Sequence, residues 1–314
     1  MKDETLNLAT LAKVFADEDE SRAFLESKRW PNGPVCPRCG STRAHALTAR
    51  EGSKKPVRQG VYFCGGCRKQ FTVRIGTIFE DSHLPLKTWL MAFHLMTSSK
   101  KGISSMQLHR ELGITLKSAW FLSHRIREAM TEHGDRGFLN GTVEVDETYV
   151  GGKPRKGSSG NGKRGRGTDK APVMVLVERD GMARTQQLER VTAKELKSVV
   201  FENVHPAAKI ATDEFPSYRG LDKAFAGGHT VVCHSRDEYV SEDGEHTNTA
   251  ESFFALLKRG HYGIFHSLSK QHLQRYCEEF AFRWNHRKVT DGERMVAAIE
   301  GAEGKRLMYR KSIN

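Results

Sequence analysis

The second half of the chain carries the clearest pattern of hydrophobic and polar positions. Residues 142–150, Thr-Val-Glu-Val-Asp-Glu-Thr-Tyr-Val, alternate and are rich in β-branched side chains, which predicts a strand. Apolar runs bounded by turn residues predict four further strands, at 171–178, 183–191, 209–212 and 230–233. Thr192 and Glu195 have the spacing of a capping box, which predicts a helix from there to about residue 204.

Two more helices follow the last predicted strand, one beginning near residue 248 and one at 268–288. The predicted order is therefore β-β-β-α-β-α-β-α. This order is what a ribonuclease-H-like core needs, an α/β fold in which a mixed sheet is flanked by helices. In such a sheet the first and fourth strands are neighbours, so side chains at 146 and 213 are expected to lie side by side.

The first half of the chain predicts helices instead. Apolar residues recur at helical spacing within 1–30, a segment that we assign to packing. Within 84–132, helices at 106–112 and 116–130 are separated by a turn at Gly113. A short helix, a glycine turn and a longer helix are typical of a helix-turn-helix. The alternative is an ordinary helical hairpin whose basic face is exposed to solvent.

Four cysteines lie between these helical regions, at positions 36, 39, 64 and 67. They form two C-x2-C pairs separated by 24 residues, the pattern of a structural zinc site with four thiolate ligands, Cys36, Cys39, Cys64 and Cys67. Four protein ligands leave no open position on the ion, so we expect a structural Zn²⁺ and no catalysis there. The alternative, a pair of disulfides, conflicts with an intracellular compartment.

Composition and charge narrow the class of protein. The 314 residues carry a formal charge of +12, which favours a polyanionic partner such as DNA. A hydrophobic fraction of 38% supports a buried core, but no apolar run approaches the length needed to cross a bilayer. The first residues have no apolar secretory segment. We therefore expect a cytoplasmic, nucleoid-associated protein that does not bind membranes.

Three acidic residues are candidates for the chemistry of this chain, and the first of them stands mid-strand, where an acid is normally unfavourable. Asp146 lies in the middle of a strand, Asp213 ends another apolar strand, and Glu251 lies in the first turn of a helix. Our hypothesis is that these three carboxylates converge on divalent metal and cut DNA. The alternative for Glu251 is a capping box with Asn248, and Asn248 is also the rival for the third metal ligand. Lys258, seven residues after Glu251, is expected to hold backbone phosphate.

Other basic residues are candidate phosphate contacts outside this cluster. On the helix at 116–130 we expect Lys117, Arg125 and Arg127 to face outward, toward a DNA groove and its phosphates. The Gly-rich basic stretch at 151–170 predicts a loop beside Asp146. This loop either holds a DNA backbone or is a solvated insertion, and the residues favour neither.

Taken together, these motifs resemble those of the zinc-ribbon-bearing insertion-sequence transposases of the DDE superfamily, the ISXO-like group. The matching segments are 36–67, 143–152, 212–215, 246–260 and 282–287. The gap of 38 residues from Asp213 to Glu251, with seven more to Lys258, fits the superfamily pattern. Members have either Glu or Asn at the third acidic position, and here both types occur within one turn.

We divide the chain accordingly. The expected parts are an N-terminal helical segment (1–30), a zinc ribbon (31–80), a helix-turn-helix-like DNA-binding region (81–135), a ribonuclease-H-like DDE catalytic domain (140–290) and a C-terminal tail (291–314). The resemblance implies DNA transposition with Mg²⁺ or Mn²⁺ as cofactor. Pairing of two element ends implies a homodimer or a higher oligomer.

The hypothesis gives each acid a role. Asp146 would bridge two ions about 3.5–4 Å apart, with Asp213 on one ion and Glu251 on the other. Water would first free a 3′-hydroxyl at the element end, and that hydroxyl would then attack target DNA. Two alternatives stay open: a non-enzymatic zinc-ribbon and helix-turn-helix regulator, and a metal-dependent nuclease of the same fold that cuts without joining.

Overall fold

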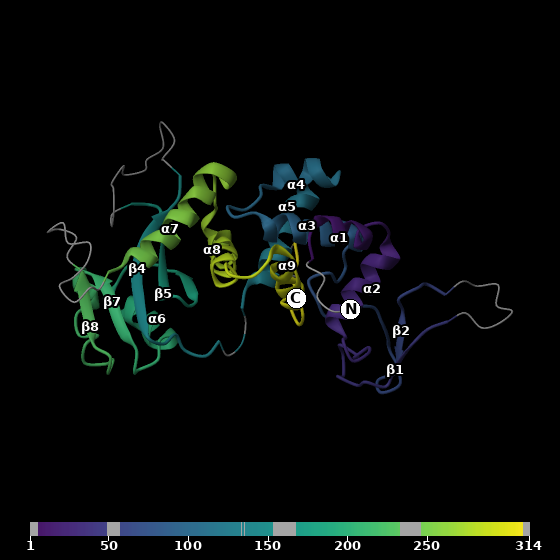
Figure 1. Ribbon diagram of the computed structural model, residues 1–314, viewed down its shortest axis with the longest axis horizontal. Coiled ribbons are helices and arrows are strands. Elements are labelled where there is room, and N and C mark those ends of the chain that lie inside the picture. Colours follow the sequence, from purple (N-terminus) through teal and green to yellow (C-terminus); the bar gives the residue numbers. More distant parts are fainter. Residues whose placement is uncertain are drawn as a thin grey trace. The chain divides into compact units, whose positions relative to one another are not determined.

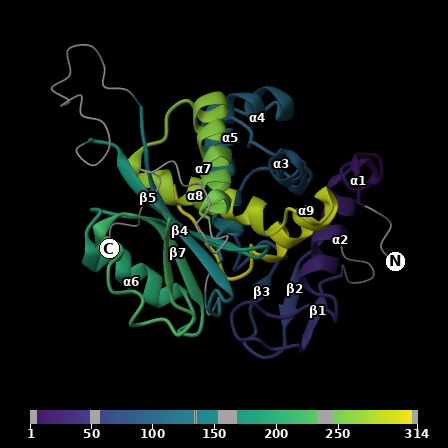
Figure 2. The ribbon, with the colours of Figure 1, turned by 60° about the vertical axis from the view of Figure 1, so that its left-hand side comes forward.

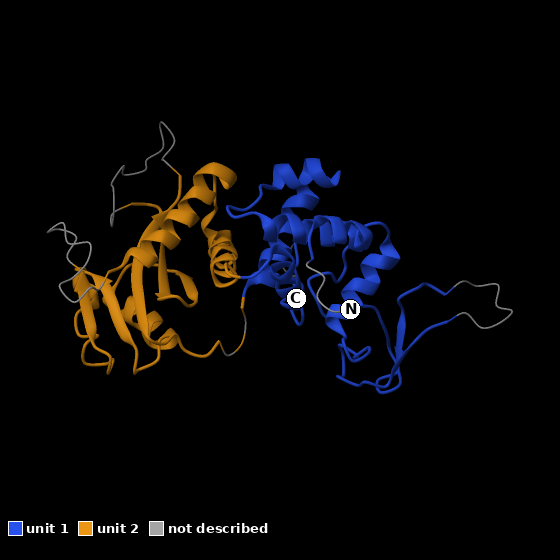
Figure 3. Ribbon diagram, viewed as in Figure 1, with its two compact units in different colours: residues 1–131, 289–314 blue, residues 132–288 orange. Residues whose placement is uncertain are grey.

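The chain divides into two compact units, shown in different colours in Figure 3. The computed structural model describes residues 6–48, 57–132, 134, 136–152, 168–232 and 246–309. Unit 1 comprises 1–131 and 289–314, and unit 2 comprises 132–288. The chain therefore begins unit 1, forms all of unit 2, and then returns to complete unit 1.

Unit 1 is a helical unit with a small three-stranded sheet. Its helices are Leu8–Val14 (α1), Glu18–Arg29 (α2), Leu86–Ser98 (α3), Ser105–Leu112 (α4), Leu116–Met130 (α5) and Asp291–Glu300 (α9). Its strands, paired in the order β1-β2-β3, are Ala44–Ala46 (β1), Tyr62–Cys64 (β2) and Gln70–Phe71 (β3). No described helix is long and apolar enough to cross a membrane.

The predicted pair of helices on either side of Gly113 is confirmed. The Ser104 hydroxyl accepts a hydrogen bond from the Gln107 amide (3.1 Å) and so caps α4. Gly113 has a φ of 62°, the left-handed conformation that ends a helix at low cost in glycine. Thr115 then caps α5 by accepting from the Ser118 amide (3.2 Å).

The C-terminal region is not a tail, which corrects our expectation for 291–314. Residues 291–300 form α9, which packs against α3 and buries Met295 and Ile299. The sequence contained the signal: Thr290 and Glu293 form a capping box at the start of this helix. This region therefore belongs to unit 1, and α9 contributes buried side chains to its core.

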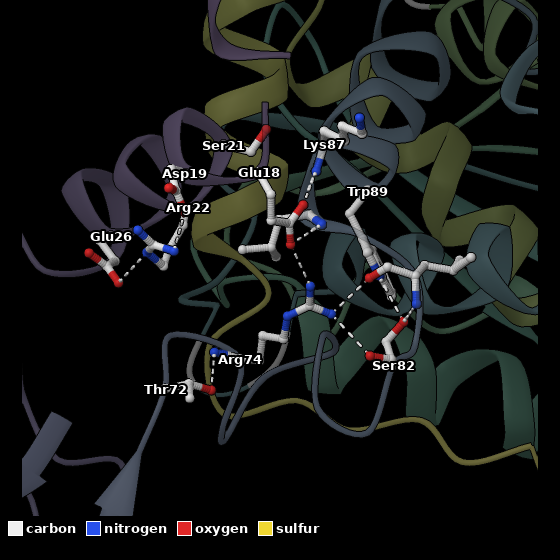
Figure 4. Close-up of polar contacts among 12 residues, drawn as sticks. Glu18, Asp19, Ser21, Arg22, Glu26, Thr72, Arg74, Ser82, Lys87 and Trp89 are labelled. Carbon is white, nitrogen blue, oxygen red and sulfur yellow. Dashed lines mark hydrogen bonds and ion pairs between the residues drawn. The ribbon is translucent and has the colours of Figure 1, made fainter. Parts of the chain in front are cut away.

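The Glu18 carboxylate links α2 both to the start of α3 and to Arg74 in the segment between them, as Figure 4 shows. The α3 N-cap is Pro85, which has no side chain able to cap the helix. The carboxylate of Glu18 takes that role, accepting from the amides of Leu86 (2.8 Å) and Lys87 (3.3 Å). Arg74 pairs with Glu18 (2.9 Å) and donates to two loop carbonyls before α3.

Unit 2 is built on a five-stranded mixed sheet with the order β6-β5-β4-β7-β8. The strands are Thr142–Val150 (β4), Ala171–Glu178 (β5), Ala183–Gln187 (β6), Lys209–Asp213 (β7) and His229–Val232 (β8). β5 and β6 run antiparallel to their neighbours, whereas β4, β7 and β8 are parallel. The first and fourth strands of this unit, β4 and β7, are therefore paired as the ribonuclease-H-like order predicts.

Helices cover both faces of this sheet (Figures 1 and 2). They are Ala193–Asn203 (α6), Asn248–Gly260 (α7) and Lys270–Asn285 (α8), with short helical turns at Pro216–Tyr218 (η2) and His261–Phe265 (η4). One core contains Val143 and Val145 of β4 and the apolar side of α6. The other core lies between the opposite face of the sheet and helices α7 and α8.

The third strand of this sheet is shorter than predicted, ending at residue 187 rather than 191. The Glu195 carboxylate accepts from the amides of Glu189 (2.8 Å) and Arg190 (3.0 Å), so these amides do not continue a strand. The Thr192 hydroxyl caps α6 by accepting from the Glu195 amide (3.3 Å), which is one half of the predicted capping box, whereas the Glu195 carboxylate bonds the two preceding loop amides instead of that of Thr192. Most of the predicted basic loop, residues 153–167, lies outside the described residues.

Candidate active site and zinc site

Asp146 and Asp213 lie next to each other on paired strands. β4 and β7 are parallel and their register pairs Val145 with Thr212, so the next residue on each strand is one of the two acids. Both carboxylates point to the face of the sheet that α7 covers, because Val143 and Val145 point to the other. Backbone pairing alone therefore sets the separation of these two side chains.

The pKa of Asp146 is raised from its ordinary value of 3.8 to about 7. Burial is the main cause, and the negative charges of Glu147, Asp213 and Glu251 add to it, while a hydrogen bond from the Glu147 amide (2.7 Å) lowers it. Asp146 is thus a half-buried acid surrounded by other carboxylates. Such a cluster of hard oxygen donors fits a divalent cation like Mg²⁺.

Glu251 approaches this cluster from the first turn of α7. Its side chain is exposed, whereas Ala250, Phe253 and Leu257 of the same helix are buried against the sheet. The helix begins at Asn248, and its N-cap residue is Thr247, whose side chain makes no capping hydrogen bond to the first helix amides. The alternative interpretation of Asn248 and Glu251 as a capping box is therefore wrong, because Asn248 is already inside the helix.

The three acids differ from the cysteines in how tightly they are grouped. Among the described residues, only the four cysteines have potential ligand atoms that all lie within 4.8 Å of one another. The carboxylates of Asp146, Asp213 and Glu251 are more widely spaced than that as a set. Lys258 lies on the exposed side of α7, seven residues after Glu251 and so about two helical turns away. Its Nζ is 5.9 Å from the centroid of the Phe254 ring.

Glu144 is an acid of this region that the sequence analysis did not single out. It lies two residues before Asp146 on β4, and its side chain is fully buried where that strand meets the start of α7. The signal was present, because Glu144 breaks the apolar pattern of the strand on the same face as Asp146.

The zinc site has the geometry that the two C-x2-C pairs predict. The Sγ atoms of Cys36 and Cys67 are 3.7 Å apart, and those of Cys39 and Cys64 are 3.6 Å apart, so neither pair is a disulfide. Backbone amides of Cys67 and Gly66 donate to Cys64 and lower the pKa of its thiol to about 6. This favours the thiolate, the form that binds Zn²⁺.

Two of the three predicted phosphate contacts on α5 are wrong. Arg125 is 4% exposed; its guanidinium donates to the Glu80 carbonyl and lies over the rings of Trp89 (5.3 Å) and Phe121 (5.4 Å). Burial lowers the pKa of Arg125 to about 10.

Arg127 is 1% exposed and donates to the Ser123 hydroxyl (2.9 Å). Both arginines are held inside unit 1, because α3 and α9 pack against this helix as well as α4. Of the three candidates, Lys117 has an exposed side chain.

Comparison with known proteins identifies the family. Residues 138–285 match the family described as ISXO2-like transposase domain, and residues 16–70 match the transposase zinc-ribbon domain. The chain is 32% identical over 285 residues to a Halobacterium salinarum protein described as an uncharacterized protein in transposable element ISH50. That match covers 86% of this chain and 92% of the relative. The protein belongs to the ISXO2-like transposase family, and it is a zinc-ribbon transposase with a ribonuclease-H-like core.

Solved structures with some likeness include two Mos1 complexes. The crystal structure of a pre-cleavage Mos1 transpososome is 14% identical, with 65% of this chain and 75% of that chain covered and a TM-score of 0.26. The Mos1 transposase paired-end complex with left transposon end is 12% identical, with coverages of 69% and 80% and a TM-score of 0.26.

Proposed function

We propose that this transposase cuts and joins DNA with Asp146, Asp213 and Glu251 as its metal-binding residues. The observation that carries the proposal is the pairing of β4 with β7, which sets Asp146 beside Asp213, with Glu251 near enough for its charge to raise the pKa of Asp146. Three carboxylates grouped around the buried Asp146 form a site that a divalent cation stabilises. Asn248 is the alternative third ligand.

Each residue has a defined part in the proposed reaction. The three acids would hold Mg²⁺ or Mn²⁺, and the chemistry that such an ion would supply is activation of the attacking oxygen and stabilisation of the leaving one. Lys258 holds a backbone phosphate of the DNA by its charge. Water is the first nucleophile and frees a 3′-hydroxyl, which then attacks the target strand, so no protein side chain becomes covalently attached to DNA.

Unit 1 supplies recognition of the element ends in this proposal. The zinc ribbon positions its basic loops, and the exposed start of α5, including Lys117, meets DNA phosphate. Zn²⁺ acts as a structural ion there. Two ends are cut in a concerted way when two or more copies of the protein pair them, so a homodimer or larger assembly on DNA is expected.

The decisive test is Mg²⁺-dependent nicking of DNA that carries the flanking element ends. Asp146→Asn keeps the shape of the side chain and removes its charge, so we expect nicking to fall below detection while end binding stays within about two-fold. The matched control is Asp180→Asn in the turn after β5, an exposed acid with a φ of 55° that Asn tolerates. Nicking that persists in Asp146→Asn refutes the site.

A strand-transfer assay separates the proposal from its two rivals. A transposase yields DNA joined to target, whereas a nuclease of the same fold yields cut ends only. A DNA-binding regulator yields neither product and tolerates Asp146→Asn without any change in its DNA binding or repression.

A further inference from the structure

Glu144 makes the most extensive set of polar contacts around the start of α7. Its Oε2 accepts hydrogen bonds from the backbone amides of Thr249 (2.8 Å) and Ala250 (3.0 Å). Its Oε1 accepts from the Thr249 hydroxyl (2.9 Å) and from Nε of Arg179 (2.9 Å). Nδ1 of His246 lies 3.1 Å from the same oxygen. The carboxylate is thus fully enclosed at the point where strand and helix meet.

These contacts replace the cap that α7 lacks. The side chain of the N-cap residue, Thr247, does not cap the helix, and the amides of Thr249 and Ala250 are bonded by Glu144 instead. Glu144 provides that partner and places a negative charge at the positive end of the helix dipole. A buried carboxylate is costly, and here Arg179 and the helix amides offset that cost.

The two ends of this contact are both next to proposed metal-binding residues. Glu144 lies two residues before Asp146 on the same face of β4, and Ala250 is the residue immediately before Glu251. One side chain therefore connects the strand that carries the first acid to the helix turn that carries the third.

The apolar contacts of α7 fix the distance between Glu251 and Asp146 less firmly than the hydrogen bonds to Glu144 do. Asp146 and Asp213 are held by backbone pairing, whereas Glu251 is on a helix that packs through Phe253, Phe254 and Leu257. Apolar packing has little directional preference, so it permits small shifts and rotations of a helix. Hydrogen bonds to two successive amides restrict both.

We propose, building on the transposase function above, that Glu144 is a positioning residue that sets Glu251 at the correct distance from Asp146 for metal binding. Arg179 completes the arrangement, because it pairs with Glu144 and donates to the His246 carbonyl (2.9 Å) at the entrance to α7. Supporting contacts around metal ligands typically change metal affinity or activity by about 10–100-fold when they are removed.

The first measurement is Mn²⁺ binding to the zinc-loaded, full-length protein by calorimetry, alongside the Mg²⁺ concentration that gives half-maximal nicking. Glu144→Gln has the same size but places an NH₂ group or a neutral oxygen against the helix amides. We call the Mn²⁺ dissociation constant and the half-maximal Mg²⁺ concentration the two metal midpoints. We expect both midpoints to rise by about 10-fold or more, while end binding and the far-ultraviolet spectrum stay unchanged.

Thr249→Val is the second variant, because it removes one hydrogen bond to Glu144 without altering any charge near the metal. We expect a smaller rise of both midpoints, about two- to five-fold. This variant separates positioning from the simple loss of a negative charge, and it provides an answer if Glu144→Gln does not fold.

Glu279→Gln is the matched control. Glu279 is also fully buried in unit 2, but it pairs with Arg283 of its own helix, α8. We expect this variant to lose stability without any change in the metal midpoints. The proposal is overturned if Glu279→Gln shifts the midpoints as far as Glu144→Gln does, or if folded Glu144→Gln and Thr249→Val both bind Mn²⁺ like the wild type.

The same titrations distinguish this proposal from the function on which it depends. If the wild type binds no Mn²⁺ beyond what Asp146→Asn binds, the metal site itself is refuted. If Asp146→Asn abolishes binding and the Glu144 and Thr249 variants do not weaken it, the metal site stands and the positioning role of Glu144 is refuted.

Discussion

At the scale of single residues, two neighbouring acids on β4, Glu144 and Asp146, have opposite surroundings. Glu144 is fully buried but meets two helix amides and an arginine, so its charge is balanced. Asp146, two residues further along the same strand, is surrounded by carboxylates and has a pKa of about 7. Glu144 therefore stabilises the junction of strand and helix, whereas Asp146 has the surroundings expected of the metal-binding residue that we propose.

Stability should therefore depend on pH in an unusual direction at Asp146. Because its folded pKa is raised from 3.8 to about 7, the folded protein binds this proton more tightly than the unfolded chain does. The destabilising effect of the carboxylate is absent below about pH 4 and grows as the pH rises to about 7. Asp146→Asn removes this effect, so without added Mg²⁺ its Tm at pH 8 should exceed that of the wild type, by roughly 2–4 °C for each kcal/mol of destabilisation that is removed.

Differential scanning calorimetry of the zinc-loaded protein measures this difference. The gain should shrink at pH 5.5, and added Mg²⁺ should stabilise the wild type but not the variant. Asp180→Asn serves again as control and should show neither effect. A Tm difference that is the same at both pH values would contradict the origin that we assign to it.

At the scale of elements, α5 shows what a hydrophobic pattern can and cannot reveal. The pattern predicted the bounds of this helix, its caps and the turn before it, because those depend on residues within a few positions. It did not predict that Arg125 and Arg127 are buried, because α9, from the far end of the chain, packs against the same helix. An amphipathic pattern predicts one buried face of a helix, but α5 packs against three helices, α3, α4 and α9, on more than one face.

Substitutions on α5 should separate DNA contact from packing. Lys117→Ala should weaken end binding a few-fold and lower the slope of log affinity against log salt by about one, without affecting Tm. Arg125→Ala removes a buried side chain stacked between two aromatic rings, so it should destabilise unit 1 by about 2 kcal/mol or more. Salt titrations of binding and denaturant unfolding measure the two effects.

These outcomes would be reversed if our first expectation for the arginines were correct. In that case Arg125→Ala would leave the midpoint of unfolding unchanged and reduce the salt slope as Lys117→Ala does. Arg110, exposed at the end of α4, provides a comparison for a surface arginine whose removal should cost little stability.

The sheet and its acids were more predictable than the links between elements. The alternation in β4 and the short apolar run of β7 gave both strands, and the family resemblance gave their pairing. The contact from Glu144 to the start of α7 joins residues about a hundred positions apart, at 144 and 250. No local pattern encodes such a partner, so the sequence alone suggested a cap by Asn248 that the structure replaces with Glu144.

At the scale of the whole molecule, unit 2 lies within unit 1 along the chain. Helix α9 follows unit 2, yet its apolar side chains belong to the core of unit 1. The Arg29 guanidinium also pairs with Glu303 (2.5 Å), which joins α2 to the segment after α9. The DNA-binding unit proposed above therefore depends on residues that come after the whole catalytic core.

Deleting residues 289–314 should for this reason damage unit 1 and spare unit 2. Loss of Met295, Ala298 and Ile299 exposes the surfaces of α3 and α5 that they cover, so we expect end binding to be lost and the first 131 residues to become sensitive to protease. Residues 132–288 should remain resistant. Limited proteolysis with mass spectrometry measures both, and equal sensitivity of the two units would contradict the division.

The return of the chain to its first unit also has a consequence for synthesis on the ribosome. Residues 132–288 emerge as one continuous stretch and have all their partners as soon as they are complete. The earlier residues must wait, because helix α9 of their core is translated only after the whole of unit 2. In a nascent chain, unit 2, which carries the proposed catalytic residues, can therefore fold before unit 1, which carries the proposed DNA-binding residues, is complete.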